Sequence, residues 1–290
     1  MTTLLQHEWL LFRVALQFLT RWPVASFERF DVAWLSESLR YFPLVGVFVA
    51  LLQWLLWLGL VYVLPHPVAL AFVMGFGLLL TGGFHEDGWA DVCDGMGGAS
   101  TRERVLTIMK DSRVGAFGAM GLVWVLLTKW TVLSYLNTAS SLLLALVMAH
   151  ALSRLAATAL IVRLDHVGDA EHSKTKPLGN QMTPGHWLLS AAMTLGVVLM
   201  VVWLTLVFGR TGLVDLTGMG GGWLGSSWLI CLILPLAAGL AALLCSHACG
   251  AYFRKRIGGY TGDCLGATQQ ISELVVYAVL LAVMSPARWS

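Results

Sequence analysis

The sequence predicts an all-α, polytopic membrane protein with about seven transmembrane helices and an N-terminal amphipathic helix. Of its 290 residues, 58% are hydrophobic and only 12% are charged, whereas ordinary soluble domains carry about 25% charged residues. The mean hydropathy is +0.76. The apolar residues gather in runs of roughly 20, the length that a helix needs to cross the hydrocarbon layer. Backbone groups in lipid must be satisfied within the segment, so such runs favour helices over barrel strands.

The first segment, residues 8–22, combines Arg13 and Arg21 with Trp, Leu and Phe and is followed by Pro23. This pattern predicts an amphipathic helix at the membrane interface, with a helix packed on the core as the alternative. No small-residue cleavage site follows it, so we do not interpret it as a secretory signal.

Seven spans follow in order. They are predicted at residues 43–64, 68–83, 116–136, 140–162, 187–208, 223–245 and 267–284. The polar connections between them include residues 99–114, 163–186 and 254–263 and a Gly-rich linker at 218–222. We expect a single integral membrane domain over residues 1–290. The five cysteines show neither zinc-site spacing nor a disulfide framework, so all five are predicted to be structural.

The distribution of basic residues predicts the orientation of these spans. Fourteen of the 18 Lys and Arg residues fall on one side and only two on the other. By the positive-inside rule, the N-terminus and the loops at about 82–115 and 254–267 should face the cytoplasm. The formal net charge of +2 is too small to indicate nucleic-acid binding.

An acidic stretch at residues 82–98 follows directly on the second span and contains Glu86, Asp87, Asp91 and Asp94 among six glycines. In a helix, the three aspartates share one stripe and Glu86 lies on its flank. Grouped carboxylates repel one another, and their hard oxygens suit Mg²⁺. The stretch therefore predicts a magnesium site of all four acids, with room for a phosphate beside the glycines. A solvated acidic helix face is the alternative.

Two further cytoplasmic segments carry candidate substrate-binding residues. Arg113 precedes the third span, and its planar donors suit a phosphate; an interfacial anchor is the alternative. The turn at 258–267 contains Gly259, Thr261 and Gly262, and a helix N-terminus at such a turn favours an anion. Asp263 in the same turn is predicted to complete a metal shell.

Ionisable residues inside spans are costly and usually functional. Arg154 shares a helix face with His150 and is predicted to reach an anionic substrate. Lys129 and Glu273 lie in other spans and are predicted to pair with each other, while His150 and His85 are interpreted as structural. Metal-binding acids beside phosphate-binding glycines favour phosphoryl transfer. The residues alone thus predict a metal-dependent phosphotransferase acting at a membrane.

At these motifs the chain resembles the bacterial cobalamin synthase family, the adenosylcobinamide-GDP ribazoletransferases. The matching motifs lie at 18–23, 42–46, 82–95, 111–115, 153–154 and 258–267, whereas 163–186 matches less clearly. The resemblance implies that adenosylcobinamide-GDP reacts with α-ribazole or α-ribazole 5′-phosphate, that GMP leaves, and that Mg²⁺ is required. It also implies a multi-pass protein of the cytoplasmic (inner) membrane. In the resulting hypothesis Asp94 or Asp263 takes the proton of the attacking hydroxyl, and Arg113 and Arg154 hold phosphate oxygens.

Two other functions are alternatives. A CDP-alcohol phosphotransferase-like lipid synthase would need Arg after Ala90, where this chain has Asp91. An ion-coupled transporter would carry its acids within the spans rather than at one membrane face. Whether the chain forms a homo-oligomer stays open.

Overall fold

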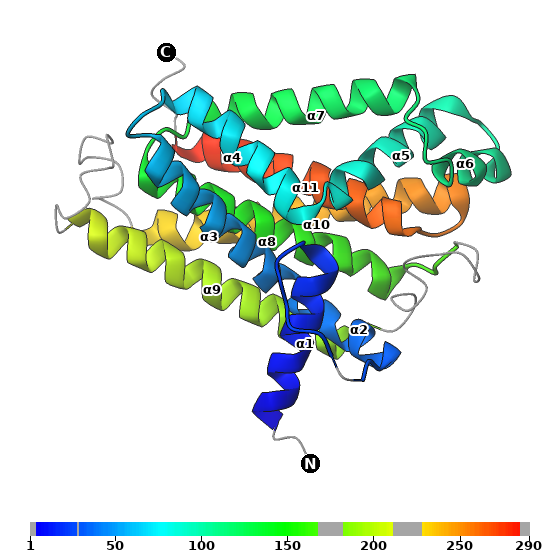
Figure 1. The fold of residues 1–290 in the computed structure, drawn as a ribbon, viewed down its shortest axis with the longest axis horizontal. Coiled ribbons are helices and arrows are strands. Elements are labelled where there is room, and N and C mark those ends of the chain that lie inside the picture. The colour runs from blue at the N-terminus through cyan, green and yellow to red at the C-terminus, as the bar shows by residue number, and fades with distance from the viewer. Residues whose placement is uncertain (1–3, 28, 168–181, 211–227, 285–290) are drawn as a thin grey trace.

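The computed structural model describes residues 4–27, 29–167, 182–210 and 228–284. Within these ranges the chain is helical and contains no strand; Figure 1 shows the arrangement. The helices are α1 (Leu4–Leu19), α2 (Val32–Ser38), η1 (Leu39–Tyr41), α3 (Phe42–Leu60), α4 (His66–Thr81), α5 (Phe84–Gly98), α6 (Arg102–Met109), α7 (Ala116–Ser134), α8 (Ala139–Arg163), α9 (Pro184–Arg210), α10 (Trp228–Ile257) and α11 (Gly262–Met284). The predicted all-α fold is confirmed.

Six helical segments in the described residues are long and apolar enough to cross a membrane. They are the continuous run from Val32 to Leu60 and the helices α7 to α11. Helices α4 and α5 are long and apolar enough only when taken together, and they meet at a bend of 89°. Counted as one broken span, they make a seventh. The chain is therefore a multi-span membrane protein, as predicted.

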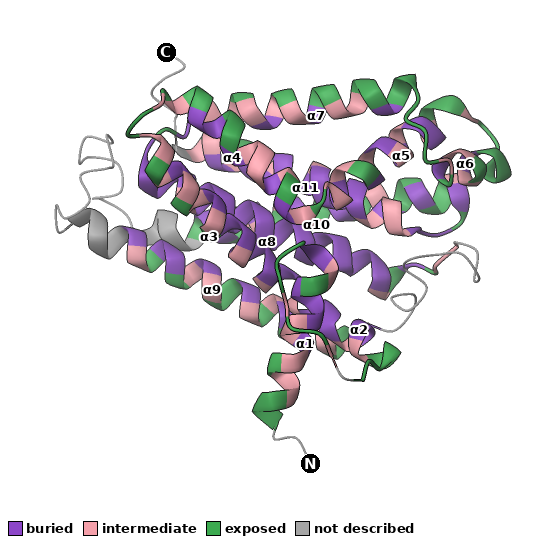
Figure 2. Cartoon of the chain, in the orientation of Figure 1, coloured by how far each residue is buried: buried purple, intermediate pink, exposed green. Residues whose placement is uncertain are grey.

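Helix α8 forms the centre of the bundle. Nearly all of its side chains between Ala139 and Ile161 are buried, and α3, α9, α10 and α11 pack around it. At Gly46 of α3 a Cβ would collide with the carbonyl of His150, so this glycine lets the two backbones meet. Figure 2 shows α8 buried along its length, whereas the outer helices such as α7 alternate between buried and exposed residues. The exposed residues of α7 include Trp124 and Leu127, which suits contact with lipid.

Several boundaries differ from those predicted. Helix α1 ends at Leu19, ahead of Pro23, and residues 99–114 contain the additional helix α6. Helix α10 runs on to Ile257, whereas the sixth span was predicted to end at residue 245. The linker at 218–222 and most of the 163–186 loop lie outside the described residues.

The extension of α10 has a physical reason in its basic residues. Arg254 donates to the carbonyl of Arg163 at 3.2 Å, and Arg256 donates to the carbonyls of Met96 and Ala99 at 3.2 and 2.5 Å. Arg256 thus caps the C-terminal end of α5, a favourable position for a cation. Because these side chains find partners on neighbouring segments, the polar sequence does not end the helix.

One end of the bundle gathers the segments that the sequence singled out. Helices α5 and α6, the start of α7, the end of α10 and the start of α11 lie together at the right of Figure 1. Segments 82–115 and 254–267 therefore share one end of the molecule.

Candidate active site

The acidic helix α5 is set at its angle by two consecutive glycines. Gly82 and Gly83 have φ values of 69° and 67°, in the left-handed region that other residues rarely adopt. Gly82 ends α4 and Gly83 precedes α5, whose first turn carries Glu86 and Asp87. Acidic residues are favourable near a helix N-terminus. The segment expected as a loop at about 82–115 is thus largely helical, which meets the condition for the shared stripe of aspartates.

Helices α5 and α11 touch through glycines on both sides. A Cβ on Gly88 would lie 3.0 Å from both the Cα and the carbonyl oxygen of Asp263. A Cβ on Gly266 would lie 3.1 Å from the carbonyl oxygen of His85. The absence of side chains at these two positions lets the acidic helix lie directly on the start of α11.

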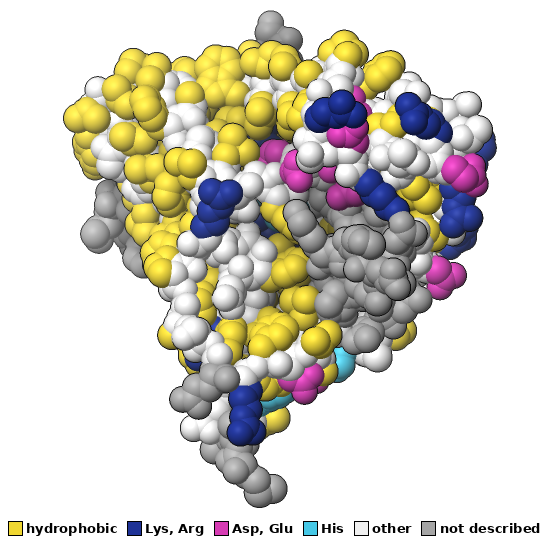
Figure 3. All heavy atoms as spheres, turned by 45° about the vertical axis from the view of Figure 1, so that its right-hand side comes forward, with side chains coloured by type: hydrophobic (Ala, Val, Ile, Leu, Met, Phe, Trp, Pro, Cys, Tyr) yellow, Lys and Arg dark blue, Asp and Glu magenta, His cyan; other side chains and the backbone are white. Residues whose placement is uncertain are grey.

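This contact places Asp263 beside two of the predicted metal ligands. At about 100° per residue, Asp91 lies about 60° and Asp87 about 100° round the helix from Gly88, both on the same side. Asp87 is exposed, and Asp91 and Asp263 are half-buried. Two elements distant in sequence therefore bring three aspartates to one region of the surface. Figure 3 shows acidic and basic side chains gathered at this end of the molecule.

Asp94 has a different position. It is 8% exposed and accepts hydrogen bonds from the backbone N–H of Gly115 at 2.7 Å and of Gly118 at 2.8 Å. These groups belong to the N-terminal turn of α7, which the carboxylate caps from another helix. A Cβ on either glycine would collide with the carboxylate, so the cap depends on both. Both oxygens of Asp94 are thus engaged by α7.

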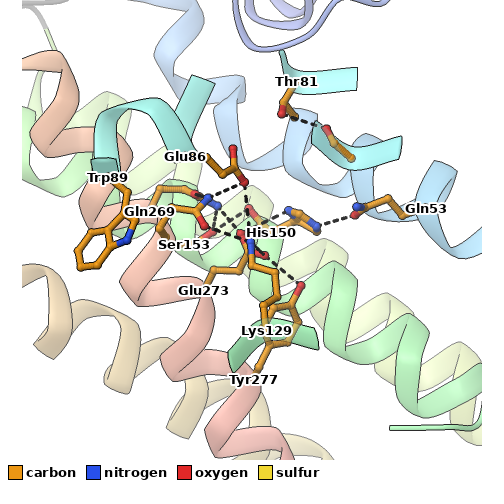
Figure 4. Close-up of polar contacts among 12 residues, drawn as sticks. Gln53, Thr81, Glu86, Trp89, Lys129, His150, Ser153, Gln269, Glu273 and Tyr277 are labelled. Carbon is orange, nitrogen blue, oxygen red and sulfur yellow. Dashed lines mark hydrogen bonds and ion pairs between the residues drawn. The ribbon is translucent and has the colours of Figure 1, made fainter. Parts of the chain in front are cut away.

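Glu86 points into the bundle rather than along the aspartate stripe (Figure 4). Its Oε1 accepts a hydrogen bond from Nε2 of Gln270 at 3.0 Å and lies 3.9 Å from Nζ of Lys129. Its Oε2 is buried with no hydrogen-bond partner. Glu86 therefore links the acidic helix to a buried polar cluster.

That cluster is centred on Glu273 of α11. Its carboxylate lies 3.0 Å from Nζ of Lys129 and accepts hydrogen bonds from Gln269 at 2.6 Å and Tyr277 at 3.1 Å. The predicted pairing of Lys129 with Glu273 is confirmed. Buried charges persist only when they are paired and hydrogen-bonded, and this carboxylate has both kinds of partner.

Arg154 joins the same cluster from α8. Its Nη1 lies 3.1 Å from Nδ1 of His150 and donates to the His150 carbonyl at 3.0 Å, while His150 Nε2 lies 2.7 Å from Oε1 of Gln53. The predicted shared face of His150 and Arg154 is confirmed. The guanidinium is 2% exposed, and its Nε has no hydrogen-bond partner.

Arg113, unlike Arg154, is exposed to solvent. Its side chain is 86% exposed and makes two-pronged contacts with Asp111 at 2.5–3.1 Å. Hydrogen bonds from the Arg113 side chain lower the pKa of Asp111 to about 2, so that carboxylate stays ionised at ordinary pH. An exposed pair of this kind is weak and is readily exchanged for another anion.

The turn before α11 is fixed by contacts with the segment after α8. Tyr260 donates to the carbonyl of Asp165 at 3.0 Å, and Val167 donates to the carbonyl of Tyr260 at 2.9 Å. A Cβ on Gly259 would collide with the Asp165 carbonyl, which gives that glycine a packing role. Thr261 Oγ1 lies 3.4 Å from both Oδ2 of Asp263 and Sγ of Cys264, so its hydroxyl can donate to either.

Two cavities lie under the acidic helix. The first has an empty volume of about 500 Å³ and is lined by the polar cluster, including Glu86, Lys129 and Glu273. The second, of about 410 Å³, has mainly apolar walls. His85 and Arg154 line both, and Gly262 lines the second.

Gln269 and Gln270 were not singled out from the sequence, although they connect Glu86 to Glu273. The available signal was their polarity inside an otherwise apolar span, which carries the same expectation of function or pairing as a charge does.

The four predicted metal ligands do not converge on one point. Glu86 contacts the buried polar cluster, and Asp94 contacts the start of α7. Among the described residues, no three His, Cys, Asp or Glu side chains form a ready metal site. Mg²⁺ is, however, commonly bound by one or two carboxylates together with substrate phosphates. Asp87 and Asp91, one helical turn apart at the surface, fit that kind of site.

Comparison with known proteins gives a consistent result. The family model described as cobalamin-5-phosphate synthase matches residues 11–281. A relative from Leptothrix cholodnii, described as adenosylcobinamide-GDP ribazoletransferase, is 43% identical over 279 residues, covering 95% of this chain and 96% of the relative. Relatives with the same description from Shewanella piezotolerans and Vibrio parahaemolyticus are 39% and 36% identical. They cover 94% and 96% of this chain and 95% and 94% of their own lengths. No solved structure matches.

Proposed function

Because this chain belongs to the cobalamin-5-phosphate synthase family, and so is a transferase of cobalamin synthesis, we propose that it joins adenosylcobinamide-GDP to α-ribazole or α-ribazole 5′-phosphate. The products are adenosylcobalamin or its 5′-phosphate, and GMP. Relatives that carry the name adenosylcobinamide-GDP ribazoletransferase over nearly their whole length support this choice of substrates.

The observation that carries the proposal is the contact between α5 and α11. The close approach at Gly88 brings the helix that carries Asp87 and Asp91 against the backbone of Asp263 at one end of the bundle. A diphosphate that reaches this end meets carboxylates from two helices and the positive charge of an exposed arginine, Arg113. This is the combination of groups that phosphoryl transfer requires.

In this proposal Asp87 and Asp91 hold Mg²⁺ together with the phosphates of the substrate. Bound Mg²⁺ supplies positive charge that stabilises the negative charge developing on phosphate oxygens. Glu86 and Asp94 do not bind the ion in this proposal but hold α5 in place. Glu86 fixes the first turn of α5 to the buried cluster, and Asp94 fixes the third turn to α7.

The remaining roles follow from position. Asp263, at the start of α11, accepts the proton of the attacking ribose hydroxyl. That hydroxyl attacks the phosphorus attached to the cobinamide, and GMP leaves on the opposite side. Arg113 exchanges Asp111 for a phosphate oxygen, at little cost because the pair is exposed.

We place the reaction at the cytoplasmic face of a bacterial inner membrane. The excess of Lys and Arg on the side that carries the acidic helix supports this orientation. Both substrates and Mg²⁺ are then available without crossing the bilayer.

The test is GMP release by protein purified in detergent or reconstituted in liposomes, with both substrates and titrated Mg²⁺. Asp91→Asn should lower turnover by about 100-fold or more, as expected when stabilisation of transition-state charge is removed. Glu103→Gln, which removes an equal charge from the exposed helix α6, is the matched control and should keep activity. An Asp91→Asn variant with full Mg²⁺-dependent turnover would exclude the proposed role of Asp91.

A further inference from the structure

The mainly apolar cavity has one wall built from aromatic rings. Phe18 of α1 stacks on Phe42 of α3 with ring centroids 5.7 Å apart and an angle of 20° between the ring planes. Phe84 of α5 meets Phe18 edge-on at 5.5 Å. All three line the cavity, whose empty volume of about 410 Å³ includes space open to the solvent. Three helices therefore hold a preformed wall suited to a flat apolar ring.

Besides His85, the polar side chains that line the cavity are Thr158 and Arg154. Thr158 donates its hydroxyl to the carbonyl of Leu155 at 2.9 Å and so has no donor to spare. The Nε of Arg154 is buried with no acceptor. An unsatisfied buried donor is costly, especially on a charged group, and one acceptor on a bound ligand would remove that cost. The preferred ligand is thus largely apolar and carries an acceptor at its edge.

The cavity also adjoins the proposed reaction site. Gly262 and Gly266 of α11 line it, and Asp263 lies between them in sequence. Gly266 approaches the backbone of α5 at His85, which lines the same cavity. A group bound there therefore lies against the first turn of α11, which carries Asp263, and against the first residues of α5.

We propose that this cavity binds the aromatic base of the α-ribazole acceptor, an inference that rests on the proposed function. That base, a benzimidazole, is flat and apolar and has a ring nitrogen that can accept from Arg154. Guanine would bring several donors and acceptors that the walls cannot satisfy. The corrin is too large for the cavity, and a lipid chain would leave the Arg154 donor without an acceptor.

The test fills the cavity from α8. Ala157 lines it, whereas Ala159, equally buried at 7% exposure two residues along the same helix, does not. Ala157→Met should raise the KM for α-ribazole by about tenfold or more, because a group that loses its pocket loses binding. The KM for adenosylcobinamide-GDP should stay unchanged, and Ala159→Met should behave as wild type. If Ala157→Met lowers the Tm below that of Ala159→Met, the smaller substitution Ala157→Val repeats the measurement.

An unchanged KM for α-ribazole, or a raised KM for adenosylcobinamide-GDP instead, would overturn the assignment. So would a co-purified lipid that Ala157→Met releases while the KM stays unchanged. If wild-type protein releases no GMP, the proposed function fails. Equilibrium dialysis with radiolabelled benzimidazole then tests, independently of turnover, whether the cavity binds the base. Saturable binding that Ala157→Met abolishes and Ala159→Met keeps supports it. No saturable binding to wild type, or equal binding to all three proteins, refutes it.

Discussion

The packing of α5 on α11 can be tested by one methyl group at Gly88. In Gly88→Ala the new Cβ lies 3.0 Å from the Cα and carbonyl oxygen of Asp263. This is about 0.5 Å closer than the optimal separation of two carbons. The contact is with backbone, so the helices themselves must separate. Overpacking of this kind costs about 1–3 kcal/mol, offset by about 1 kcal/mol from the better helix propensity of alanine.

The same displacement should also slow catalysis. A displacement of 1 Å in an active site can cost about 100-fold in rate, so a shift of about 0.5 Å should cost roughly tenfold. We expect Gly88→Ala to lower kcat/KM for GMP release by about that factor and the Tm by only a few degrees. Gly75→Ala, on α4, is the matched control because nothing lies within 4 Å of its Cβ. Full activity in Gly88→Ala at an unchanged Tm would refute the importance of this contact.

Two further substitutions test the supports of the acidic helix by thermal unfolding in detergent. Asp94→Ala leaves the N–H groups of Gly115 and Gly118 without their acceptor and should destabilise the protein by about 2 kcal/mol, with a smaller loss in Asp94→Asn. A Tm equal to that of wild type in Asp94→Ala would contradict the cap. Lys129→Met leaves Glu273 buried without its closest cation and should cost roughly 3–5 kcal/mol, much of which Lys129→Met combined with Glu273→Gln should recover. Simple addition of the two single losses would show that the pair is not coupled.

The architecture was largely predictable because the bilayer imposes a simple rule on length and polarity. Long apolar runs became helices, as expected, whereas the segment expected as a loop at about 82–115 contains α5 and α6. The boundary of α10 was not predictable from the same rule. Its basic end at Arg254 and Arg256 is held by carbonyls of distant segments, and such partners are not visible in the sequence.

The site was predicted less completely, for a related reason. Helical periodicity places Asp87, Asp91 and Asp94 on one stripe, but it does not reveal which neighbour each stripe position meets. The start of α7 meets Asp94, and the buried cluster meets Glu86. The pairing of Lys129 with Glu273 was predictable because charges inside a membrane have few acceptable partners.

The charge balance of the buried cluster has a consequence for an energised cell. A single charge moved across the membrane potential exchanges about 2.3 kcal/mol per 100 mV. Lys129 and Arg154 oppose Glu86 and Glu273, two cations against two anions around one cavity. Their sum is zero, so the electric field exerts no net force on the group. Polarising or depolarising the host membrane should therefore not shift the group as a whole across the bilayer, and the enzyme should work as well in an unenergised vesicle as in a respiring one.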